Sequence, residues 1–256
     1  MVTTAAELRN WKTRMAVGRM AYESGHFSQA SRHFYLALKI VEDKELGDEF
    51  GYQTLISLAK ALACQGKFAD AEKYLLEVER TQPEDAVERA WDLEELSQLY
   101  WQTGRTEQSE EVANKALALL EQSDEQPAEL KAKILRNLAR AKGNAGDVKE
   151  CSRLIESALL VIEDSDLGKQ SLIYGEVLVI KALLLAEEDK LEAASQVYHQ
   201  ALQLVQMNRG PFHPRIAEIM DFFGEYAEHK GKDDLAKEFR RRGTEIRQFR
   251  RRSGLY

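Results

Sequence analysis

Apolar residues recur along the whole chain in short groups, each of which ends at a small turn residue. Six such turn residues stand 38 to 43 positions apart, at Gly25, Gly66, Gly104, Gly146, Asp189 and Gly231. In the second unit, apolar residues stand eleven, eight, seven and four positions before the turn, at Leu55, Leu58, Ala59 and Leu62. This 3-1-3 spacing lies on one side of an α-helix. Each unit is therefore predicted to be a helix, a tight turn and a second helix.

Small residues keep fixed distances from these six turns. Seven positions before the turns stand Gly18, Ala59, Ser97, Ala139, Ala182 and Gly224, and five positions after them stand Ala30, Ala71, Ser109, Cys151, Ala194 and Ala236. A glycine inside a helix costs about 0.5–1 kcal/mol relative to alanine, so Gly18 and Gly224 need a packing reason. We expect the turn residues and both flanking positions to be small because helices approach closely there.

The predicted fold is all-α, a right-handed superhelical solenoid of about six antiparallel helix pairs. No segment alternates apolar and polar residues long enough to form a strand. The four prolines all fall between units, where helices end: Pro83, Pro127, Pro211 and Pro214. A single pair cannot bury its apolar stripe, so neighbouring pairs must stack. The sequence predicts one domain with repeats at about 11–44, 52–85, 90–123, 132–165, 175–208 and 217–250, and a short basic tail at 251–256.

The unit resembles the tetratricopeptide repeat, whose pattern is W-x2-L-G-x2-Y, then A-x3-F, then P. The first part is matched by Val17-Gly18-x2-Ala21 and by Phe223-Gly224-x2-Ala227. The second part is matched by Ala30-x3-Phe34, Ala71-x3-Leu75 and Ala194-x3-Tyr198, and Pro83 stands at the last position. The resemblance covers about residues 11 to 250. HEAT-type repeats share the longer period, but the positions of the small residues fit the tetratricopeptide form better.

The period of about 42 residues is longer than the usual 34 and is similar to that of kinesin light chain and its bacterial relatives. Their unit-opening loop is similar to Gly210-Pro-Phe-His213-Pro214-Arg-Ile216-Ala217. Their first helix and turn are similar to Leu135-Arg-Asn137-Leu138-Ala139 followed by Asn144-Ala-Gly146-Asp. The resemblance implies a concave groove, lined by the first helix of each unit, that holds an extended peptide. It does not imply the carboxylate clamp of some relatives, which needs Lys and Asn in the first helix, because Met15 and Arg19 stand at the relevant places.

Positions thirteen, ten, nine, six and two before each turn share the helix face roughly opposite the buried stripe. In the fourth unit these positions hold Lys133, Arg136, Asn137, Arg140 and Asn144. Guanidinium groups can bind carboxylates in a fork, and asparagine amides can bond both polar groups of a peptide backbone. The position six before the turn is polar or basic in the first four units, with Arg19, Lys60, Gln98 and Arg140.

Aromatic and apolar residues extend this face. The third unit adds Trp91 and Trp101, and the fifth adds Ile180 and Leu183. Tryptophan combines a large apolar area with one N–H donor, which is common among interface anchors. We therefore predict that the groove binds an extended acidic peptide with at least one bulky apolar side chain. Three other interpretations stay open: a plainly solvated polar face, packing of Trp101 on the next unit, and self-association through Ile180 and Leu183.

Charge is unevenly distributed between the body of the chain and its end. The formal charge is −7, yet residues 240–252 hold seven arginines against Glu245, which leaves −13 on the remainder. An acidic body argues against a general nucleic-acid binder. The apolar stripe Leu235, Phe239, Gly243, Ile246 and Phe249 predicts an amphipathic last helix. This helix could cap the array, or its arginines could tether the protein to anionic lipid or nucleic acid.

The sequence gives little support for catalysis, and neither a cofactor nor a metal is expected. No two histidines stand three or four apart on one helix, and no P-loop, dinucleotide fingerprint or Gly-x-Ser-x-Gly elbow is present. Cys151 occupies a small-residue position, so a buried packing thiol is the better interpretation than a redox or metal site. The start lacks a signal pattern and no run is long enough to cross a bilayer, so a cytoplasmic protein, monomeric or weakly self-associating, is expected.

Overall fold

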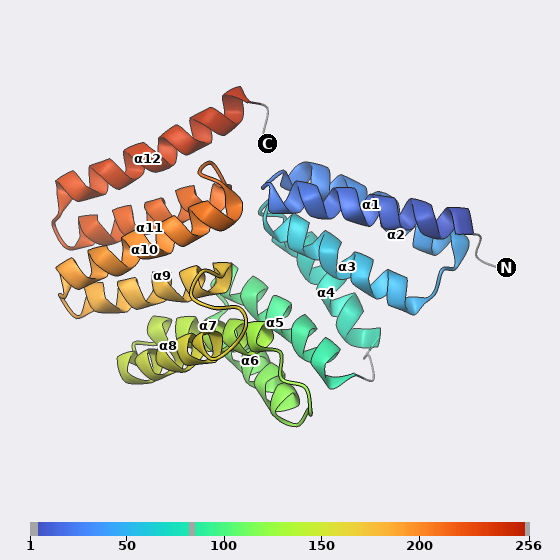
Figure 1. Ribbon diagram of the computed structural model, residues 1–256, viewed down its shortest axis with the longest axis horizontal. Helices are drawn as coiled ribbons and strands as arrows, with labels where there is room; N and C mark the ends of the chain where they lie inside the picture. The colour runs from blue at the N-terminus through green and yellow to red at the C-terminus, as the bar shows by residue number, and fades with distance from the viewer. Residues whose placement is uncertain (1–4, 82–84, 254–256) are drawn as a thin grey trace. The chain divides into compact units, whose positions relative to one another are not determined.

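The computed structural model describes residues 5–81 and 85–253. These residues form helices and no strands (Figure 1). The helices within the described ranges are α1 (Ala5–Glu23), α2 (Phe27–Lys44), α3 (Asp48–Ala63), α4 (Phe68–Thr81), α5 (Ala86–Gln102), α6 (Thr106–Glu121), α7 (Ala128–Asn144), α8 (Val148–Glu163), α9 (Leu172–Glu187), α10 (Leu191–Arg209), α11 (Pro214–His229) and α12 (Asp233–Arg252). The predicted all-helical fold is confirmed, and Pro83 lies outside the described residues.

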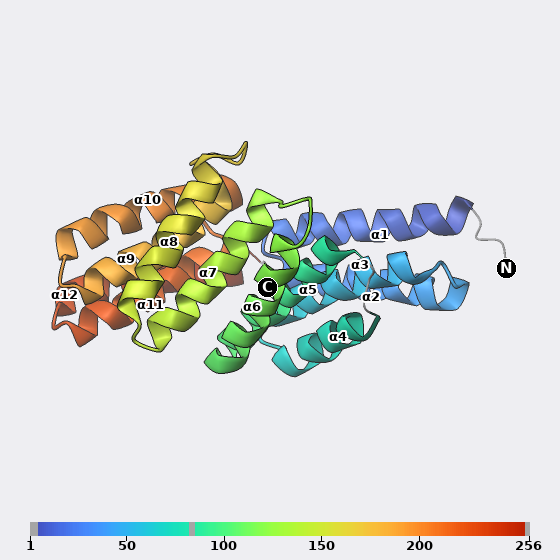
Figure 2. The same cartoon turned by 90° about the horizontal axis from the view of Figure 1, so that it is seen from below.

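The helices divide between two compact units, Met1–Glu125 and Gln126–Tyr256. In the first unit α1 packs against α2, α3 against α4 and α5 against α6, as antiparallel neighbours joined by short turns (Figures 1 and 2). The second unit repeats this plan with α7 and α8, α9 and α10, and α11 and α12. The first helices of successive pairs also touch, α1 with α3, α3 with α5, and α7 with α9. A single continuous solenoid stays a prediction.

The six turn residues are small for a different reason from the one the sequence suggested. All six have left-handed backbone, with φ between 59° and 78°. A Cβ added at Gly66, Gly104, Gly146 or Gly231 would meet nothing within 4 Å. The residue after each turn donates its N–H to a carbonyl five positions earlier, as Lys67 does to Leu62 at 3.0 Å. This is the Schellman end of a helix, which favours glycine for its backbone freedom. The expected close helix contact at the turn residue is therefore wrong.

Close helix contact does explain the small residues seven positions before the turns. A Cβ at Gly18 would lie 2.5 Å from Cε1 of the buried Phe34 ring. A Cβ at Gly224 would lie 3.2 Å from Cγ of Arg240. In the third pair, Ser97 and Ser109 exchange hydrogen bonds, each hydroxyl donating to the other's carbonyl at 2.9 and 2.8 Å. The packing reason predicted for Gly18 and Gly224 is therefore confirmed.

The apolar stripe faces the inside of each pair. Leu55, Leu58, Ala59 and Leu62 are all buried, and so are Leu135, Leu138 and Ala139 in the fourth pair. A leucine removed from water in this way contributes roughly 1.5–3 kcal/mol to folding. Because the stripe occupies one side of each first helix, the opposite side of α1, α3 and α5 is available for other contacts.

Helix α12 incorporates most of the arginine-rich segment into the fold. Phe239, Gly243 and Ile246 of its predicted stripe are buried, whereas Leu235 and Phe249 stay 45% and 41% exposed. The stripe is therefore shorter than expected at both ends. Ion pairs hold the arginines, joining Arg240 to Glu228, Arg241 to Glu245, Arg242 to Glu238 and Arg247 to Asp221. These pairs favour the capping role over a free basic surface. Helix α12 continues through Arg252 and so takes in the first two residues of the segment predicted as a tail.

Candidate functional site

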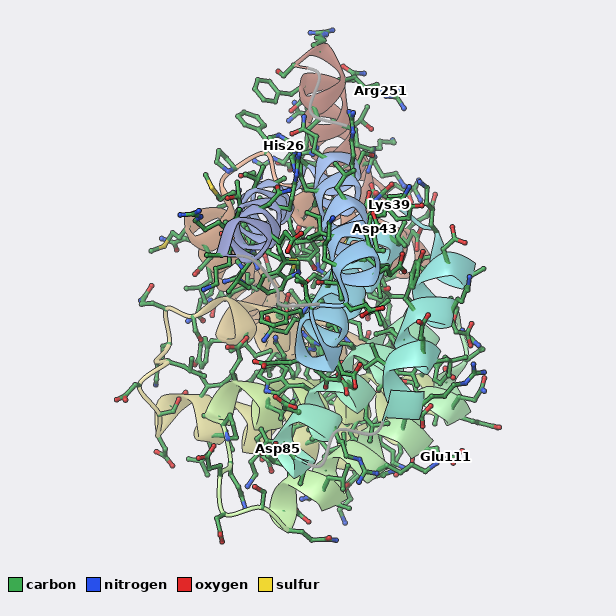
Figure 3. All side chains as sticks on the ribbon, turned by 90° about the vertical axis from the view of Figure 1, so that its right-hand side faces the viewer. His26, Lys39, Asp43, Asp85, Glu111 and Arg251 are labelled. Atoms are coloured by element: carbon green, nitrogen blue, oxygen red, sulfur yellow. The ribbon has the colours of Figure 1, made fainter. Side chains whose placement is uncertain are left out.

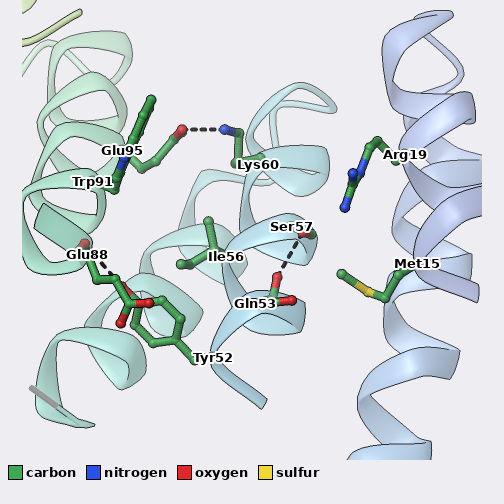
Figure 4. Close-up of a pocket in the computed structure, with 10 residues that line it drawn as sticks. All are labelled: Met15, Arg19, Tyr52, Gln53, Ile56, Ser57, Lys60, Glu88, Trp91 and Glu95. Carbon is green, nitrogen blue, oxygen red and sulfur yellow. Dashed lines mark hydrogen bonds and ion pairs between the residues drawn. The ribbon is translucent and has the colours of Figure 1, made fainter. Parts of the chain in front are cut away.

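A pocket of about 380 Å³ opens on the face shared by α1, α3 and α5 (Figure 4). Its lining comes from all three helices: Met15 and Arg19 of α1; Tyr52, Gln53, Ile56, Ser57 and Lys60 of α3; Glu88, Trp91 and Glu95 of α5. All but Tyr52 and Glu88 stand thirteen, ten, nine or six positions before a turn glycine. The pocket therefore lies on the helix face that the repeat spacing singles out.

Contacts between first helices hold the pocket open. The indole N–H of Trp11 donates to Thr54 Oγ1 at 2.9 Å, which ties α1 to α3. The Trp11 ring also meets the edge of Phe50, with ring centroids 4.8 Å apart. Both Trp11 and Thr54 are buried, so this contact fixes the spacing of the two helices without using any pocket residue. A rigid frame of this kind lowers the ordering cost of binding a ligand.

The charged side chains of the pocket fall into paired and unpaired groups. Lys60 forms an ion pair with Glu95 across α3 and α5. Within the part of the chain that the structure describes, the exposed Arg19 guanidinium has no carboxylate partner, and the exposed Glu88 carboxylate has no basic partner. Figure 4 shows Arg19 and Glu88 on opposite sides of the pocket, with Ile56 between them. The basic row predicted from the sequence is therefore partly neutralised here.

A buried carboxyl lies directly behind the pocket wall. The Tyr52 hydroxyl donates to Asp92 Oδ2 and lies 3.1 Å from the carbonyl oxygen of Glu88. Asp92 is buried, and its Oδ1 has no hydrogen-bond partner. Burial raises the pKa of Asp92 to about 7; the nearby Glu88 and Glu95 carboxylates also raise it, whereas the Tyr52 hydrogen bond opposes the shift. The α5 side of the pocket is therefore acidic. One of its carboxyl groups, that of Asp92, is buried behind Tyr52.

The apolar part of the pocket comes from three side chains on three helices. Ile56 and Trp91 are partly exposed, and the buried Met15 forms the wall on the α1 side. An apolar floor between fixed polar groups is typical of ligand sites. This arrangement offers room for one bulky side chain together with charges that orient what enters.

The second unit places its predicted site residues in a buried ionic network. Arg136, Asn137 and Arg140 are only 3%, 0% and 7% exposed. The Arg136 guanidinium pairs with Glu176 of α9 and donates to Asn137 Oδ1 at 3.1 Å. Lys133 pairs with Glu129 at 2.9 Å. These interactions give the side chains a structural role within the unit, and a ligand role for them stays a prediction.

Glu176 is the centre of this network. Burial by itself raises the pKa of its carboxyl, but Arg136, Arg215, Arg140 and Lys133 together lower it to about 2. The carboxylate is therefore ionised throughout the neutral range. The sequence pattern placed the basic side chains correctly on one helix face but missed this anion, which stands on the following first helix.

The structure brings together only part of the predicted site. Arg19, Lys60 and Trp91 line one pocket, whereas Gln98 and Trp101 of α5 are partly exposed outside its lining. Asn144 is exposed at the end of α7, Ile180 is buried, and Leu183 is partly exposed on α9. The sequence reasoning missed Tyr52, Glu88, Glu95 and Asp92. Comparing adjacent repeats for opposite charges on this face would have revealed the Lys60–Glu95 pair.

The described residues provide neither a cluster suited to a metal centre nor a helix suited to crossing a membrane. No group of three or more His, Cys, Asp or Glu side chains in ranges 5–81 and 85–253 is placed to hold a metal ion. In the same ranges, no helix combines the length and the apolar character needed to span a bilayer. His213 directly precedes α11, and its Nδ1 accepts a hydrogen bond from the Arg215 N–H at 3.2 Å. His213 is therefore the N-cap of this helix.

No protein-family profile matches the chain, and no curated protein sequence does. Several solved structures share its fold. The apo form of RapI has a TM-score of 0.75 at 15% identity, with 96% of this chain and 85% of RapI covered. PlcR of Bacillus thuringiensis, solved with the peptide PapR7 and DNA, has a TM-score of 0.66 at 14% identity, covering 81% and 72%. A putative kinesin light chain of Podosopora anserina with TPR-like repeats has a TM-score of 0.56 at 18% identity, covering 80% and 98%. The chain thus has the fold of tetratricopeptide-like helical repeat proteins.

Proposed function

We propose that this protein is a non-enzymatic interaction module that binds an extended peptide on the face formed by α1, α3 and α5. The observation that carries the proposal is the pocket of about 380 Å³, whose lining follows the repeat spacing and combines an apolar floor with the unpaired Arg19. The structure of PlcR, which has a similar fold, was solved with a peptide, and this supports a peptide as the ligand.

One bulky apolar side chain of the peptide enters between Ile56, Met15 and Trp91. An acidic side chain beside it pairs with Arg19, whose planar guanidinium can take a carboxylate in two parallel hydrogen bonds. The exposed Gln53 amide carries both donors and an acceptor, which suits the N–H and C=O groups of an extended backbone. The side chains stand on packed helices, so the peptide rather than the protein undergoes most of the ordering.

Titration calorimetry with three short peptides tests this proposal. The first carries leucine and phenylalanine beside glutamates, the second carries the same apolar pair beside serines, and the third carries the glutamates without the apolar pair. We expect the first to bind tightest, and the loss of either feature to weaken binding by about tenfold, which corresponds to about 1.4 kcal/mol. Equal heats from all three peptides, or no heat from any, would reject the proposed site.

Matched variants locate the binding on the protein. Ile56→Asp puts a charge on the pocket floor and is expected to abolish binding of the first peptide. Leu160→Asp makes the same change at the exposed side chain of Leu160 on α8, outside this pocket, and is expected to leave binding intact. Circular dichroism of both variants checks that the helices are retained.

A further inference from the structure

The pocket face of the first unit carries opposite charges at its two ends. On α1, the exposed Lys12 and Arg19 stand thirteen and six positions before the turn, and Arg19 lines the pocket. Residues seven positions apart lie on the same side of a helix, so Lys12 shares the side of Arg19. Neither has a carboxylate partner among the residues that the structure describes. The α1 end of the face is therefore positive.

The α5 end of the same face is negative. Asp85 caps the helix by accepting the Glu88 N–H at 2.8 Å, and Figure 3 shows Asp85 at the start of this helix. Glu88 follows in the first turn, with its side chain lining the pocket. Asp92 adds a third carboxyl one turn later, behind Tyr52. Of these three carboxyls, Glu88 is the one that lines the pocket.

The middle of the face is electrically neutral and partly apolar. Lys60 and Glu95 cancel each other in their ion pair between α3 and α5. Ile56 and the uncharged Gln53 and Ser57 supply the rest of the α3 surface. A ligand lying across the three helices therefore meets positive charge, then an apolar floor, then negative charge.

We infer that the peptide bound here carries an acidic residue, an apolar residue and a basic residue in series, with the basic residue held by Glu88. This inference rests on the proposed peptide-binding function and specifies its ligand. Neighbouring helices pack about 8–10 Å apart, so α1 and α5 are separated by roughly 16–20 Å across α3. Glu88 also stands ten repeat positions nearer the start of its helix than Arg19 does, an offset of about 15 Å along the helices. The two side chains are therefore roughly 22–25 Å apart, and an extended chain, which rises about 3.3 Å per residue, places the acidic and basic residues about seven positions apart.

Repulsion between like charges disfavours peptides that carry the same charge at both ends. A peptide with acidic residues at both ends would bring a carboxylate against Glu88, and one with basic residues at both ends would bring a cation against Arg19. Such contacts discriminate between partners by repulsion as well as by attraction. The charges select composition rather than chain direction, because an extended peptide can reverse its direction and still place its acidic end beside Arg19.

Three peptides of equal length test the inference: Glu-Ser-Ser-Leu-Phe-Ser-Ser-Lys, Glu-Ser-Ser-Leu-Phe-Ser-Ser-Glu and Lys-Ser-Ser-Leu-Phe-Ser-Ser-Lys, each with blocked ends. We expect the unaltered protein to bind the mixed peptide about tenfold more tightly than either of the others. Variant Arg19→Glu is expected to prefer the doubly basic peptide, and Glu88→Lys the doubly acidic one. The double variant is expected to prefer the mixed peptide again. Both side chains are exposed, so the substitutions leave the core untouched.

Control variants Arg9→Glu and Glu77→Lys change exposed charges of α1 and α4 outside the pocket and are expected to keep the original preference. Binding of all three peptides with equal affinity, or variants that keep the preference of the unaltered protein, would overturn this inference and leave the peptide-binding function standing. Failure of every peptide to bind every protein would overturn both.

Discussion

His213 is expected to make the second unit sensitive to mild acid. The side chain is only 9% exposed and caps α11 through its unprotonated Nδ1. Burial lowers the pKa of His213, and Arg209, Arg250 and Arg215 lower it further, to about 4 from an ordinary value of 6.5. Protonation would place a cation among three arginines and remove the acceptor that caps the helix.

The size and sign of the effect follow from this pKa difference. Between pH 6.5 and pH 4 the unfolded chain binds a proton at this histidine and the folded chain does not, so acid favours unfolding. The stability is fully present above pH 6.5 and is lost as the pH falls toward 4. The difference between the two pKa values corresponds to about 3 kcal/mol in the limit, of which about 2 kcal/mol is lost by pH 5.

Urea denaturation of the wild type and of His213→Asn, followed by far-ultraviolet circular dichroism at pH 7 and pH 5, measures this effect. Asparagine is a good helix N-cap and does not titrate in this range, so the variant keeps the cap and loses the pH dependence. We expect the wild type to lose about 2 kcal/mol more than the variant between the two pH values. The exposed His229→Asn serves as the control and should behave like the wild type. Equal acid losses in the wild type and His213→Asn would refute the argument.

Three further predictions concern packing, the ionic network and the thiols. Gly18→Ala is expected to lower the melting temperature, because the new methyl group would overlap a buried ring. This overpacking costs about 1–3 kcal/mol, which exceeds the gain in helix propensity. Gly51→Ala should raise the melting temperature, because its methyl group makes only an ordinary contact at 3.7 Å. Glu176→Gln is expected to destabilise the protein by about 3 kcal/mol in urea titrations, because it leaves its buried arginine partner uncompensated. A thiol reagent should modify the exposed Cys64 quickly and Cys151 only after denaturation, because Cys151 is buried and burial, with a nearby carboxylate, raises its pKa to about 11.

The helix pairs and the face of the pocket could be predicted because both follow from periodicity within one helix. The 3-1-3 apolar spacing determines which side of α3 is buried, and the remaining positions fall on the opposite side by geometry alone. Counting back from Gly66 puts Gln53, Ile56 and Lys60 on this face, although only Lys60 was singled out beforehand, and all three line the pocket.

The small size of the turn residues could not by itself predict why glycine occupies these positions. A small residue can satisfy either a close contact or a left-handed backbone, and sequence spacing does not separate the two. Gly18 satisfies the first requirement and Gly66 the second. Asp189 indicates that the backbone requirement applies at the turns, because it occupies a turn position with φ of 59°. Aspartate tolerates left-handed backbone better than most residues, yet its side chain would be a poor choice for a close helix contact.

The net charge of the pocket could not be read from any single helix, because it depends on pairing between adjacent repeats. Lys60 pairs with Glu95 in the first unit and Arg136 pairs with Glu176 in the second, each partner standing about one repeat later in the sequence. A charge on a first helix is thus neutralised when the next first helix offers an opposite charge at a neighbouring offset.

Among the described residues Arg19 forms no ion pair, because the next first helix, α3, offers it no opposite charge at a neighbouring offset. The corresponding positions of α3 hold Gln53, Ile56 and Ser57, none of which carries a charge. Lys60, at the equivalent position of the next repeat, is neutralised because α5 offers Glu95. The charge available to a ligand is therefore that of the side chains that form no ion pair with the first helix of the next repeat. By that measure, the first unit retains a cation on α1 and an anion on α5, where the sequence pattern alone predicted a basic row.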